Sequence, residues 1–483
     1  MGELDSLSVA KEVAPRETAE ALRAMDDWLA SPGLSTAVDA VGAAISLRVA
    51  HVAQDAARFV LVNAHSLESE IRLAKRALSM NVGDPLPPPP DATDAQPEAE
   101  YAAVRSRRRD LRQDPRNAVA WAELSRSQAI LGHPSAALAS MRLAVALGGE
   151  SRYILRSATR LFVHVDAPDE AYALLTRRAR AFEDPWLMAA EIATADLASK
   201  PTRMRRAGRN TLERHAYSDR ALSELASALA TLELNTGRAK DARRLFKLSL
   251  ADPTENALAQ AEWASHHLSG LDRLDDLVKT PLAYEARART SLVDGQWTAS
   301  AADSWYWYWD QPFSSEATIF GSYGTGIAGD FEQSAEFASA GLLSNPTNEI
   351  LRNNAAYALL QLNRIEPAAR HLAKIDSTRL DGKHIIANLA TRGLLAYRLG
   401  MIAMGRSLYM AAVDGADRKY PDMQAMAAIL MSLEELRAGT ERARELAELA
   451  LRISEQVSDP GVSIWRSRLK EQLDGSLVPQ GTC

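Results

Sequence analysis

Turn-forming residues recur along this chain at intervals close to 34 residues, and this period constrains the fold more than any other feature. Gly295, Gly329 and Asn363 are separated by 34 residues each, and each lies between two apolar stretches with helical spacing. Gly132 and Asp166 are separated by the same interval. A period of this length is typical of stacked helical hairpins, in which each hairpin buries its apolar face against its neighbours. The sequence therefore predicts an all-α solenoid.

The same criterion extends the repeat over most of the chain. Further hairpin turns are expected at Lys200, Gly237, Gly270, Gly400 and Gly439. The step from Gly270 to the next turn is only 25 residues, which predicts a shortened repeat. Such a repeat either bends the solenoid or splits it into two blocks that meet near residues 270–295.

Composition and charge exclude several classes of protein. With 47% hydrophobic and 24% charged residues, the chain has the composition of a folded, soluble protein. Its one cysteine, Cys483, allows neither an intrachain disulfide nor a cluster of thiolate ligands. The acidic N-terminus does not have the pattern of a secretory signal, and charges interrupt the most apolar run, residues 37–62. We therefore expect a cytoplasmic protein without a membrane span.

Residues 1–83 are predicted to be helical but not repetitive. From Leu34 to Leu78, apolar residues recur at spacings of three or four and form one stripe on a helix. Two interpretations remain open: one helix roughly 70 Å long, or a hairpin broken near residues 63–66. The stripe could be buried by the flank of the solenoid or by self-association. In a coiled-coil homodimer or docking helix formed by residues 34–78, Asn63 would select the register.

Two short regions separate or follow the helical ones. Residues 84–100 contain PLPPPPDAT and are predicted to form a semi-rigid linker, because consecutive prolines lack amide donors and favour polyproline II. Residues 458–483 are expected to be the end of a helix followed by a mobile tail, since GSLVPQGTC has no periodicity.

Two units carry a specific packing pattern around their turns. In DPRNAVAWAELSRSQAILGHPSAALASMRLAVAL, the key residues are Trp121, Leu124, Ser125, Gly132, Ala137, Met141 and Ala144. In NPTNEILRNNAAYALLQLNRIEPAARHLAKI, they are Ala355, Ala356, Leu359, Asn363, Ala368, Leu372 and Ile375. Small residues at such positions let two helix axes approach while large ones fill the gaps. With this pattern, residues 101–457 resemble the tetratricopeptide repeat family.

The resemblance implies a right-handed superhelix that acts as a non-enzymatic scaffold and captures a protein or peptide in its concave groove. First-helix residues line that groove in the family, which indicates Arg126, Tyr323, Asn353 and Tyr357 as candidate contacts. The aromatic run at residues 305–309 cannot face inward as a whole, because successive helical residues are about 100° apart. Most of the run is expected in the core, and Trp305 and Trp309 are further candidate contacts.

Some members of this family bind a C-terminal carboxylate through a clamp of Lys, Asn and Arg side chains. Asn354 falls at one clamp position. The other positions hold uncharged residues, namely Ile319, Tyr323, Ala387 and Thr391. The sequence therefore predicts that this clamp is absent.

Two arginine clusters offer an alternative function, the binding of nucleic-acid phosphates. Arg105, Arg108, Arg109 and Arg112 share one helix face, and Arg205, Arg206 and Arg209 share another. The competing interpretation is a solvated face neutralised by acids or by an acidic partner. A formal net charge of −6 gives no global attraction to nucleic acid, so this partner is disfavoured.

Motifs for catalysis, metals and cofactors are weak. Residues 324–329 spell the glycine pattern of a nucleotide-binding regulator, but the stretch before them has helical character where the motif needs a buried strand. His266 and His267 are adjacent and cannot share one metal on a helix, and the chain has no HExxH or GxSxG. We therefore predict no catalytic residue, no metal and no cofactor.

Overall fold

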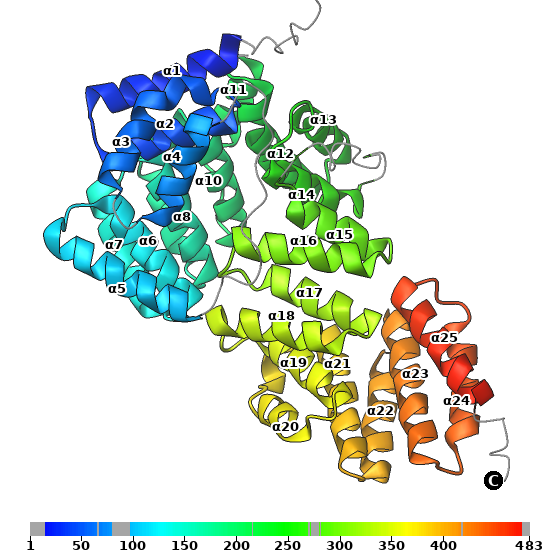
Figure 1. Cartoon of the computed structure of the whole chain (residues 1–483). Helices are drawn as coiled ribbons and strands as arrows, with labels where there is room; N and C mark the ends of the chain where they lie inside the picture. The colour runs from blue at the N-terminus through cyan, green and yellow to red at the C-terminus, as the bar shows by residue number, and fades with distance from the viewer. Residues whose placement is uncertain are drawn as a thin grey trace, which may run out of the picture. The chain divides into compact units, whose positions relative to one another are not determined.

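The computed structural model describes residues 15–64, 67–79, 97–214, 216–268, 271, 280, 282–416 and 419–475. Every regular element in these ranges is a helix, which confirms the all-α prediction (Figure 1). The chain divides into two compact units, unit 1 (Met1–Ala286) and unit 2 (Arg287–Cys483). The turn predicted at Gly270, most of the proline-rich linker and the tail that ends at Cys483 lie outside the described residues.

Unit 1 begins with four helices that precede the repeats and a short 3-10 helix among them. These are α1 (Pro15–Ala30), α2 (Leu34–Ser46), η1 (Ala50–Ala53), α3 (Gln54–Asn63) and α4 (Glu68–Ser79). The hairpin helices that follow are α5 (Pro97–Gln113), α6 (Ala118–Ile130), α7 (Pro134–Gly148), α8 (Arg152–His164), α9 (Pro168–Thr176), η3 (Ala179–Phe182), α10 (Pro185–Leu197), α11 (Arg205–Glu213), α12 (Asp219–Asn235), α13 (Ala239–Ser249) and α14 (Glu255–Ser265).

Unit 2 continues the hairpins after α15 (Tyr284–Val293), whose first residues belong to unit 1. Its helices are α16 (Trp297–Asp310), α17 (Glu316–Ala328), α18 (Phe331–Ser344), α19 (Glu349–Gln361), α20 (Ile365–Ala373), η5 (Ser377–Arg379), α21 (Gly382–Arg398), α22 (Ile402–Ala416), α23 (Pro421–Ala438), α24 (Ala443–Ser454) and α25 (Pro460–Gly475).

A residue with positive φ closes each hairpin whose turn the structure describes. The predicted turn residues with this geometry are Gly132, Asp166, Gly237, Gly295, Gly329, Asn363, Gly400 and Gly439. The turn between α10 and α11 was placed one residue too late, because Ser199 and not Lys200 has the positive φ. The left-handed residue lets the next amide reach back into the helix, as His133 N–H does to the carbonyl of Gln128 at 2.8 Å.

Many first helices of the hairpins, though not α17 and α23, begin at a side-chain cap, which satisfies backbone amides that have no partner within the helix. In each case the side-chain oxygen accepts a hydrogen bond from an amide of the first turn. The capping residues are Asn117 for α6, Ser151 for α8, Asp184 for α10, Ser218 for α12, Thr254 for α14, Asn348 for α19 and Asp381 for α21. The sequence thus marks both ends of a first helix, with a cap at its start and a left-handed residue at its end.

Of the two interpretations left open for residues 34–78, the structure excludes a single helix from Leu34 to Leu78. The chain leaves α2 at Arg48, which has a φ of 62°, and α3 ends at Asn63, which agrees with the alternative of a break near residues 63–66. The side-chain amide of Asn63 donates to the carbonyl of Phe59 in its own helix at 2.8 Å.

The apolar stripe is buried within unit 1. Val41 and Leu67 lie in one hydrophobic core with Val119 and Leu124 of α6. Asp39 of α2 caps α8 by accepting from the amides of Arg152 at 2.9 Å and Tyr153 at 2.7 Å. The stripe therefore packs on the flank of the repeats, and the physical argument for a homodimer through residues 34–78 no longer holds.

Two predicted region boundaries also differ from the helix boundaries in the structure. Helix α5 starts at Pro97, inside the predicted linker 84–100. Residues 460–475 form α25, a separate helix that packs into unit 2 through Trp465 and Leu469, and they are not the end of the preceding helix.

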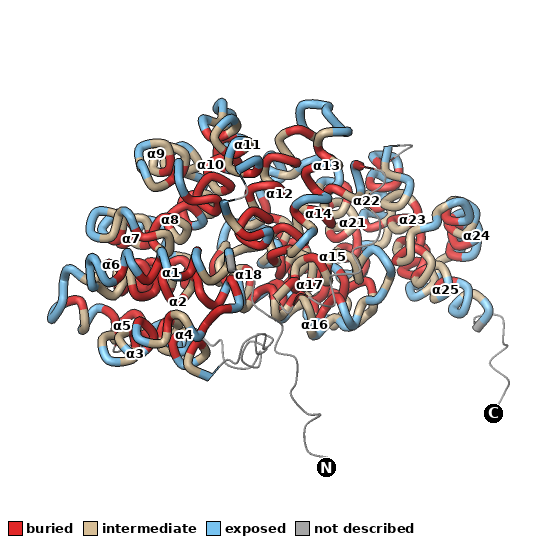
Figure 2. The backbone as a smooth tube through the Cα atoms, turned by 90° about the horizontal axis from the view of Figure 1, so that it is seen from above, coloured by how far each residue is buried: buried red, intermediate tan, exposed pale blue. Residues whose placement is uncertain are grey.

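In unit 1, buried positions follow α8, α10 and α12, whereas α9, α11 and α13 carry exposed residues along the outer edge (Figure 2).

Candidate functional site

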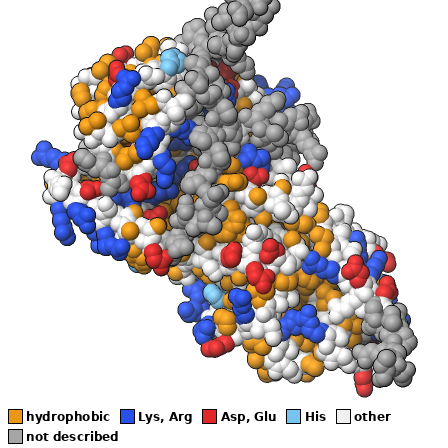
Figure 3. Space-filling model, in the orientation of Figure 1, with side chains coloured by type: hydrophobic (Ala, Val, Ile, Leu, Met, Phe, Trp, Pro, Cys, Tyr) orange, Lys and Arg blue, Asp and Glu red, His pale blue; other side chains and the backbone are white. Residues whose placement is uncertain are grey.

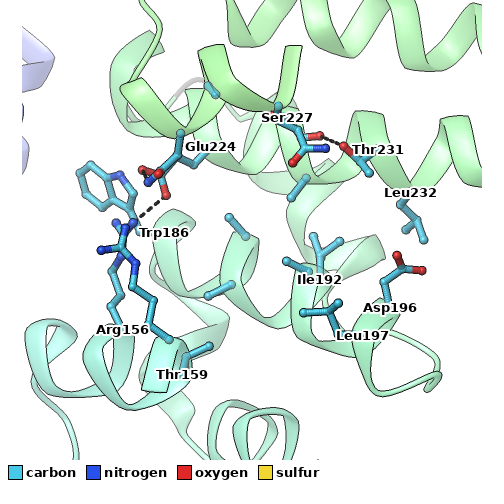
Figure 4. A pocket seen from close by; sticks show the side chains of 18 of the residues that line it. Arg156, Thr159, Trp186, Ile192, Asp196, Leu197, Glu224, Ser227, Thr231 and Leu232 are labelled. Carbon is cyan, nitrogen blue, oxygen red and sulfur yellow. Dashed lines mark hydrogen bonds and ion pairs between the residues drawn. The ribbon is translucent and has the colours of Figure 1, made fainter. Parts of the chain in front are cut away.

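A groove of about 540 Å³ lies on unit 1 and is lined by α8, α10, α12 and α14 (Figure 4). These are first helices of successive hairpins, which is where the resemblance places a binding surface. Alanines form much of its lining, namely Ala189, Ala190, Ala193, Ala228 and Ala257, and Trp186 and Trp263 add large apolar faces. Its volume falls in the range of roughly 300–1,000 Å³ that is typical of ligand sites.

Polar side chains in this groove are arranged in pairs. Arg156 Nη2 lies 2.9 Å from Glu224 Oε2, and the Asn256 amide donates to the same carboxylate at 3.0 Å (Figure 4). Asn235 donates to Asp196 at 3.3 Å. The groove thus combines apolar faces with both signs of charge and with amide groups that can donate and accept. None of the residues predicted from the sequence lies in it, although the repeat register of α8, α10 and α12 was available as a signal.

Arg126 lies elsewhere, beside a buried carboxylate between the N-terminal helices and the repeats. Glu123 of α6 accepts hydrogen bonds from Ser69 Oγ at 2.8 Å and from the Tyr153 hydroxyl at 2.6 Å. Burial alone would raise the pKa of Glu123, but the positive charges of Arg126 and Arg107 outweigh this and lower it. Arg126 therefore stabilises a buried charge, and the Glu123 network joins α4, α6 and α8.

The pKa of Glu70, a member of the same network, shifts in the opposite direction. Burial and the negative charge of Glu123 raise the pKa of Glu70 to about 8. The Tyr153 hydroxyl lies 2.9 Å from Glu70 and 2.6 Å from Glu123, but it carries one hydrogen and cannot donate to both. In its protonated form, Glu70 can instead donate to the Tyr153 oxygen.

The other three predicted groove residues do come together. Tyr323, Asn353 and Tyr357 line one pocket of about 140 Å³ in unit 2, between α17, α19, α21, α23 and the start of α25. Asn354 and Thr391, which stand at clamp positions, line the same pocket. No Lys, Arg or His side chain does so among the residues that the structure describes. The prediction that a carboxylate clamp is absent fits this lining.

Tyrosines and two acids dominate the electrostatics of this pocket. Burial together with the charges of Asp459 and Asp422 raises the pKa of Tyr323 to about 12. Burial likewise raises the pKa of Tyr357 far above its ordinary value, so both hydroxyls stay neutral. The Asn354 amide donates to Ser322 Oγ at 2.9 Å, which fixes its orientation at the pocket wall.

The aromatic run of α16 packs mostly within unit 2. Trp305 stacks on Phe337 of α18 with ring centroids 3.9 Å apart, and Trp309 meets Tyr308 edge-on at 5.2 Å. Trp307 is buried against Phe320. Trp305 and Trp309 are half-buried and line neither the groove nor the pocket described above.

The two arginine clusters differ in their surroundings. Arg205 and Arg209 of α11 both lie 2.7 Å from the buried carboxylate of Glu233, which also pairs with Arg238, so one negative charge is shared among three arginines. Arg206 is exposed beside them. By contrast, Arg105, Arg108, Arg109 and Arg112 are all exposed on α5, where Lys and Arg side chains gather on the surface (Figure 3).

Glycines of the nucleotide-like motif serve helix packing. Residues 324–328 are the last turn of α17, no strand precedes them among the described residues, and Gly329 closes the turn with a φ of 92°. A Cβ at Gly324 would lie 3.0 Å from Leu292. Within the described part of the chain, no group of three or more His, Cys, Asp or Glu side chains is arranged to hold a metal ion.

Comparisons with known proteins add the following. No family model and no curated protein matches the chain. A chain of the APC/C hetero-tetramer Cut9–Hcn1 aligns with 12% identity and a TM-score of 0.38 over 94% of this chain and 93% of its own length. Yeast Tom70 aligns with 11% identity and a TM-score of 0.30 over 96% and 98%.

Among the described residues, no helix is both long and apolar enough to cross a membrane.

The chain's own hairpins define its architecture, since each described turn is closed by a left-handed residue and small side chains lie at the helix crossings. With that geometry, the chain is an all-α protein of stacked helical hairpins, and the repeat pattern of its sequence resembles that of the tetratricopeptide repeat family.

Proposed function

We propose that the protein is a non-enzymatic scaffold and that unit 1 holds a segment of a partner protein in the groove between α8, α10, α12 and α14. The observation that carries this proposal is the groove itself, which first helices of four successive hairpins line over about 540 Å³. A solenoid of this kind presents an extended surface and has no need of a catalytic centre.

The chemistry of the lining supports a peptide as the ligand. Alanines along α10 and α12 let a ligand backbone approach closely, and the exposed or half-exposed amides of Asn235, Asn256 and Gln260 can pair with its N–H and C=O groups. Trp263 offers the kind of aromatic anchor that dominates interface energetics. Charges of both signs line the groove, so the partner segment carries apolar and mixed charged residues and not a run of one sign.

A groove-blocking variant tests this proposal. Ala193 is exposed on α10 and lines the groove, so Ala193→Trp would occlude it. Ala139, exposed on α7 outside the groove, provides a matched control as Ala139→Trp. Quantitative affinity purification from the native cell should recover a stoichiometric partner with the wild type and with Ala139→Trp. Recovery should fall about tenfold with Ala193→Trp, which corresponds to the loss of one hot-spot contact. Equal recovery with all three proteins, each shown to be folded by its melting curve, would refute the proposal.

A second candidate function, phosphate binding by α5, is favoured by one observation. Arg105, Arg108, Arg109 and Arg112 are exposed on one helix, and no ion pair of theirs is formed within the described residues. If they bind nucleic acid, the affinity for a labelled 20-nucleotide RNA should fall steeply as salt rises, with a slope of about −0.7 per phosphate contact on a logarithmic plot. Replacing the four arginines by glutamine should flatten that slope, and an unchanged slope removes this candidate.

A further inference from the structure

We propose that the pocket of unit 2 binds the arginine side chain of a peptide segment, with Asp422 and Asp459 as the acceptors of its guanidinium group. This site is separate from the groove of unit 1 and does not depend on the function proposed for that groove. Its evidence is the charge, shape and apolar lining of the pocket.

Charge complementarity carries the proposal. Asp422 and Asp459 both line the pocket, and no cationic side chain of the described residues lines it with them. Asp459 uses Oδ1 to cap α25, accepting from the amide of Val462 at 2.9 Å. Within the described part of the chain, no hydrogen bond engages Asp459 Oδ2, and no hydrogen bond or ion pair engages Asp422. Two carboxylates close to one pocket without a cation favour a positively charged ligand.

The arginines Arg398 and Arg468 of unit 2 do not provide a positive charge for this pocket. Arg398 pairs with Glu434, with Nη2 at 3.1 Å from Oε1. Arg468 donates to the carbonyl of Ala328 at 2.6 Å and stacks on Trp465. Both arginines are committed to contacts outside the pocket, so neither pairs with Asp422 or Asp459.

The rest of the lining fits the long stem and planar head of arginine. Met423, Met426 and Ile386 provide apolar contacts for a methylene stem, and the rings of Tyr323 and Tyr357 can lie against a guanidinium plane. A volume of about 140 Å³ accommodates one side chain. It lies well below the roughly 300–1,000 Å³ of sites for whole small ligands. Arginine suits this lining better than lysine, because its planar head presents five donors and can stack on a tyrosine ring.

The test compares arginine with its neutral isostere. Two probes, acetyl-Leu-Arg-Leu-amide and acetyl-Leu-citrulline-Leu-amide, are titrated into the full chain by isothermal titration calorimetry. We expect the arginine peptide to bind and the citrulline peptide to bind at least about tenfold more weakly, because a charge-assisted contact is lost. The double variant Asp422→Asn, Asp459→Asn should weaken the arginine peptide by a similar factor. Asparagine retains the cap of α25, so this variant is expected to fold.

Two controls make the result decisive. Glu332→Gln removes an exposed carboxylate of α18 outside the pocket and should leave the affinity of the arginine peptide unchanged. Ala193→Trp blocks the groove of unit 1 and should likewise leave it unchanged. Equal affinities for the two peptides, an unaffected double variant, or no binding of the arginine peptide up to about 5 mM would each overturn the proposal. If instead Ala193→Trp abolishes binding while the double variant does not, the peptide occupies the groove and the arginine site is refuted.

Discussion

At the scale of single residues, the pKa of each buried carboxylate is set by the balance between burial, which raises it, and the donors and positive charges that reach it, which lower it. Burial would raise the pKa of Glu435, but hydrogen bonds from Arg406, Thr440 and Tyr397 outweigh it and hold the pKa at about 2. Glu20 lies in unit 1 and is dominated by burial, which raises its pKa to about 7. The same residue type therefore serves as a charged anchor in one place and as a neutral hydrogen-bonding group in another.

Glu70 gives a pH prediction. Its pKa rises from the ordinary 4.5 to about 8 on folding, so the native state keeps a proton that the unfolded chain releases. The contribution to stability is complete below about pH 4.5 and is lost as the pH rises through the folded pKa. Glu70→Gln keeps a neutral donor and should lose less stability between pH 6 and about 9 than the wild type. Urea unfolding across this range measures the difference, and parallel profiles for the two proteins would contradict it.

At the scale of helices, glycines in α17 allow close packing, and two of them differ in how much room they have. A Cβ at Gly321 would lie 2.4 Å from the buried ring of Phe337. A Cβ at Gly326 would have Ser334 at 3.4 Å and Tyr357 at 3.8 Å, which are ordinary contacts. Within the nucleotide-like motif, Gly324 and Gly329 are thus explained by a close contact and by a positive φ, whereas Gly326 has room for a side chain.

This contrast predicts opposite effects of the same substitution. Gly321→Ala should destabilise the protein by about 1–3 kcal/mol, because Phe337 cannot move without disturbing the core. Gly326→Ala should be neutral or stabilising by up to about 1 kcal/mol, since alanine has the higher helix propensity. Chemical denaturation of both variants provides the measurement, and a stable Gly321→Ala protein would show that the α17 and α18 crossing is looser than described.

Hairpin turns give a second helix-scale prediction. Gly400 has a φ of 75°, and a Cβ added there would meet no described atom within 4 Å, so Gly400→Ala adds backbone strain without a clash. It should cost about 1–2 kcal/mol. Ser199 already bears that strain at a φ of 52°, so Ser199→Gly should be stabilising by up to about 1 kcal/mol. Melting temperatures that shift in the same direction for both variants would be inconsistent with this account of the turns.

At the scale of the whole molecule, the two units have distinct hydrophobic cores. Leu67 belongs to a core of unit 1 that also contains Val119 and Leu124, whereas Leu372 belongs to a core of unit 2 with Leu394 and Tyr409. The N-terminal helices are therefore part of the folding unit that contains the first repeats.

Hydrogen exchange can test this division. Leu67→Ala should cost about 2–5 kcal/mol and lower the amide protection of α6 as well as α3 and α4. Leu372→Ala, a matched substitution of a buried leucine, should lower protection in α19 to α22 and leave α6 unchanged. If Leu67→Ala left α6 fully protected, the N-terminal helices would be a separate body after all.

Much of the local structure could be predicted from the sequence. The 34-residue spacing of Gly295, Gly329 and Asn363 located turns that the structure confirms by their positive φ. Caps and left-handed residues act within one helical turn, so their signal is contained in a few consecutive residues. Of the four groove residues that the resemblance implied, Tyr323, Asn353 and Tyr357 line one pocket and Arg126 does not, and their role in binding stays a prediction.

Only the tertiary structure decided which partner each side chain meets. The stripe at residues 34–78 is covered by the chain's own repeats, and Arg205 and Arg209 both pair with Glu233, which lies 24 or more residues away along the chain. The groove of unit 1 likewise depends on four helices that stack in space. Periodicity in a sequence indicates which face of a helix is apolar, but it does not identify the segment that covers this face. That neighbour is set by packing between segments far apart in the chain.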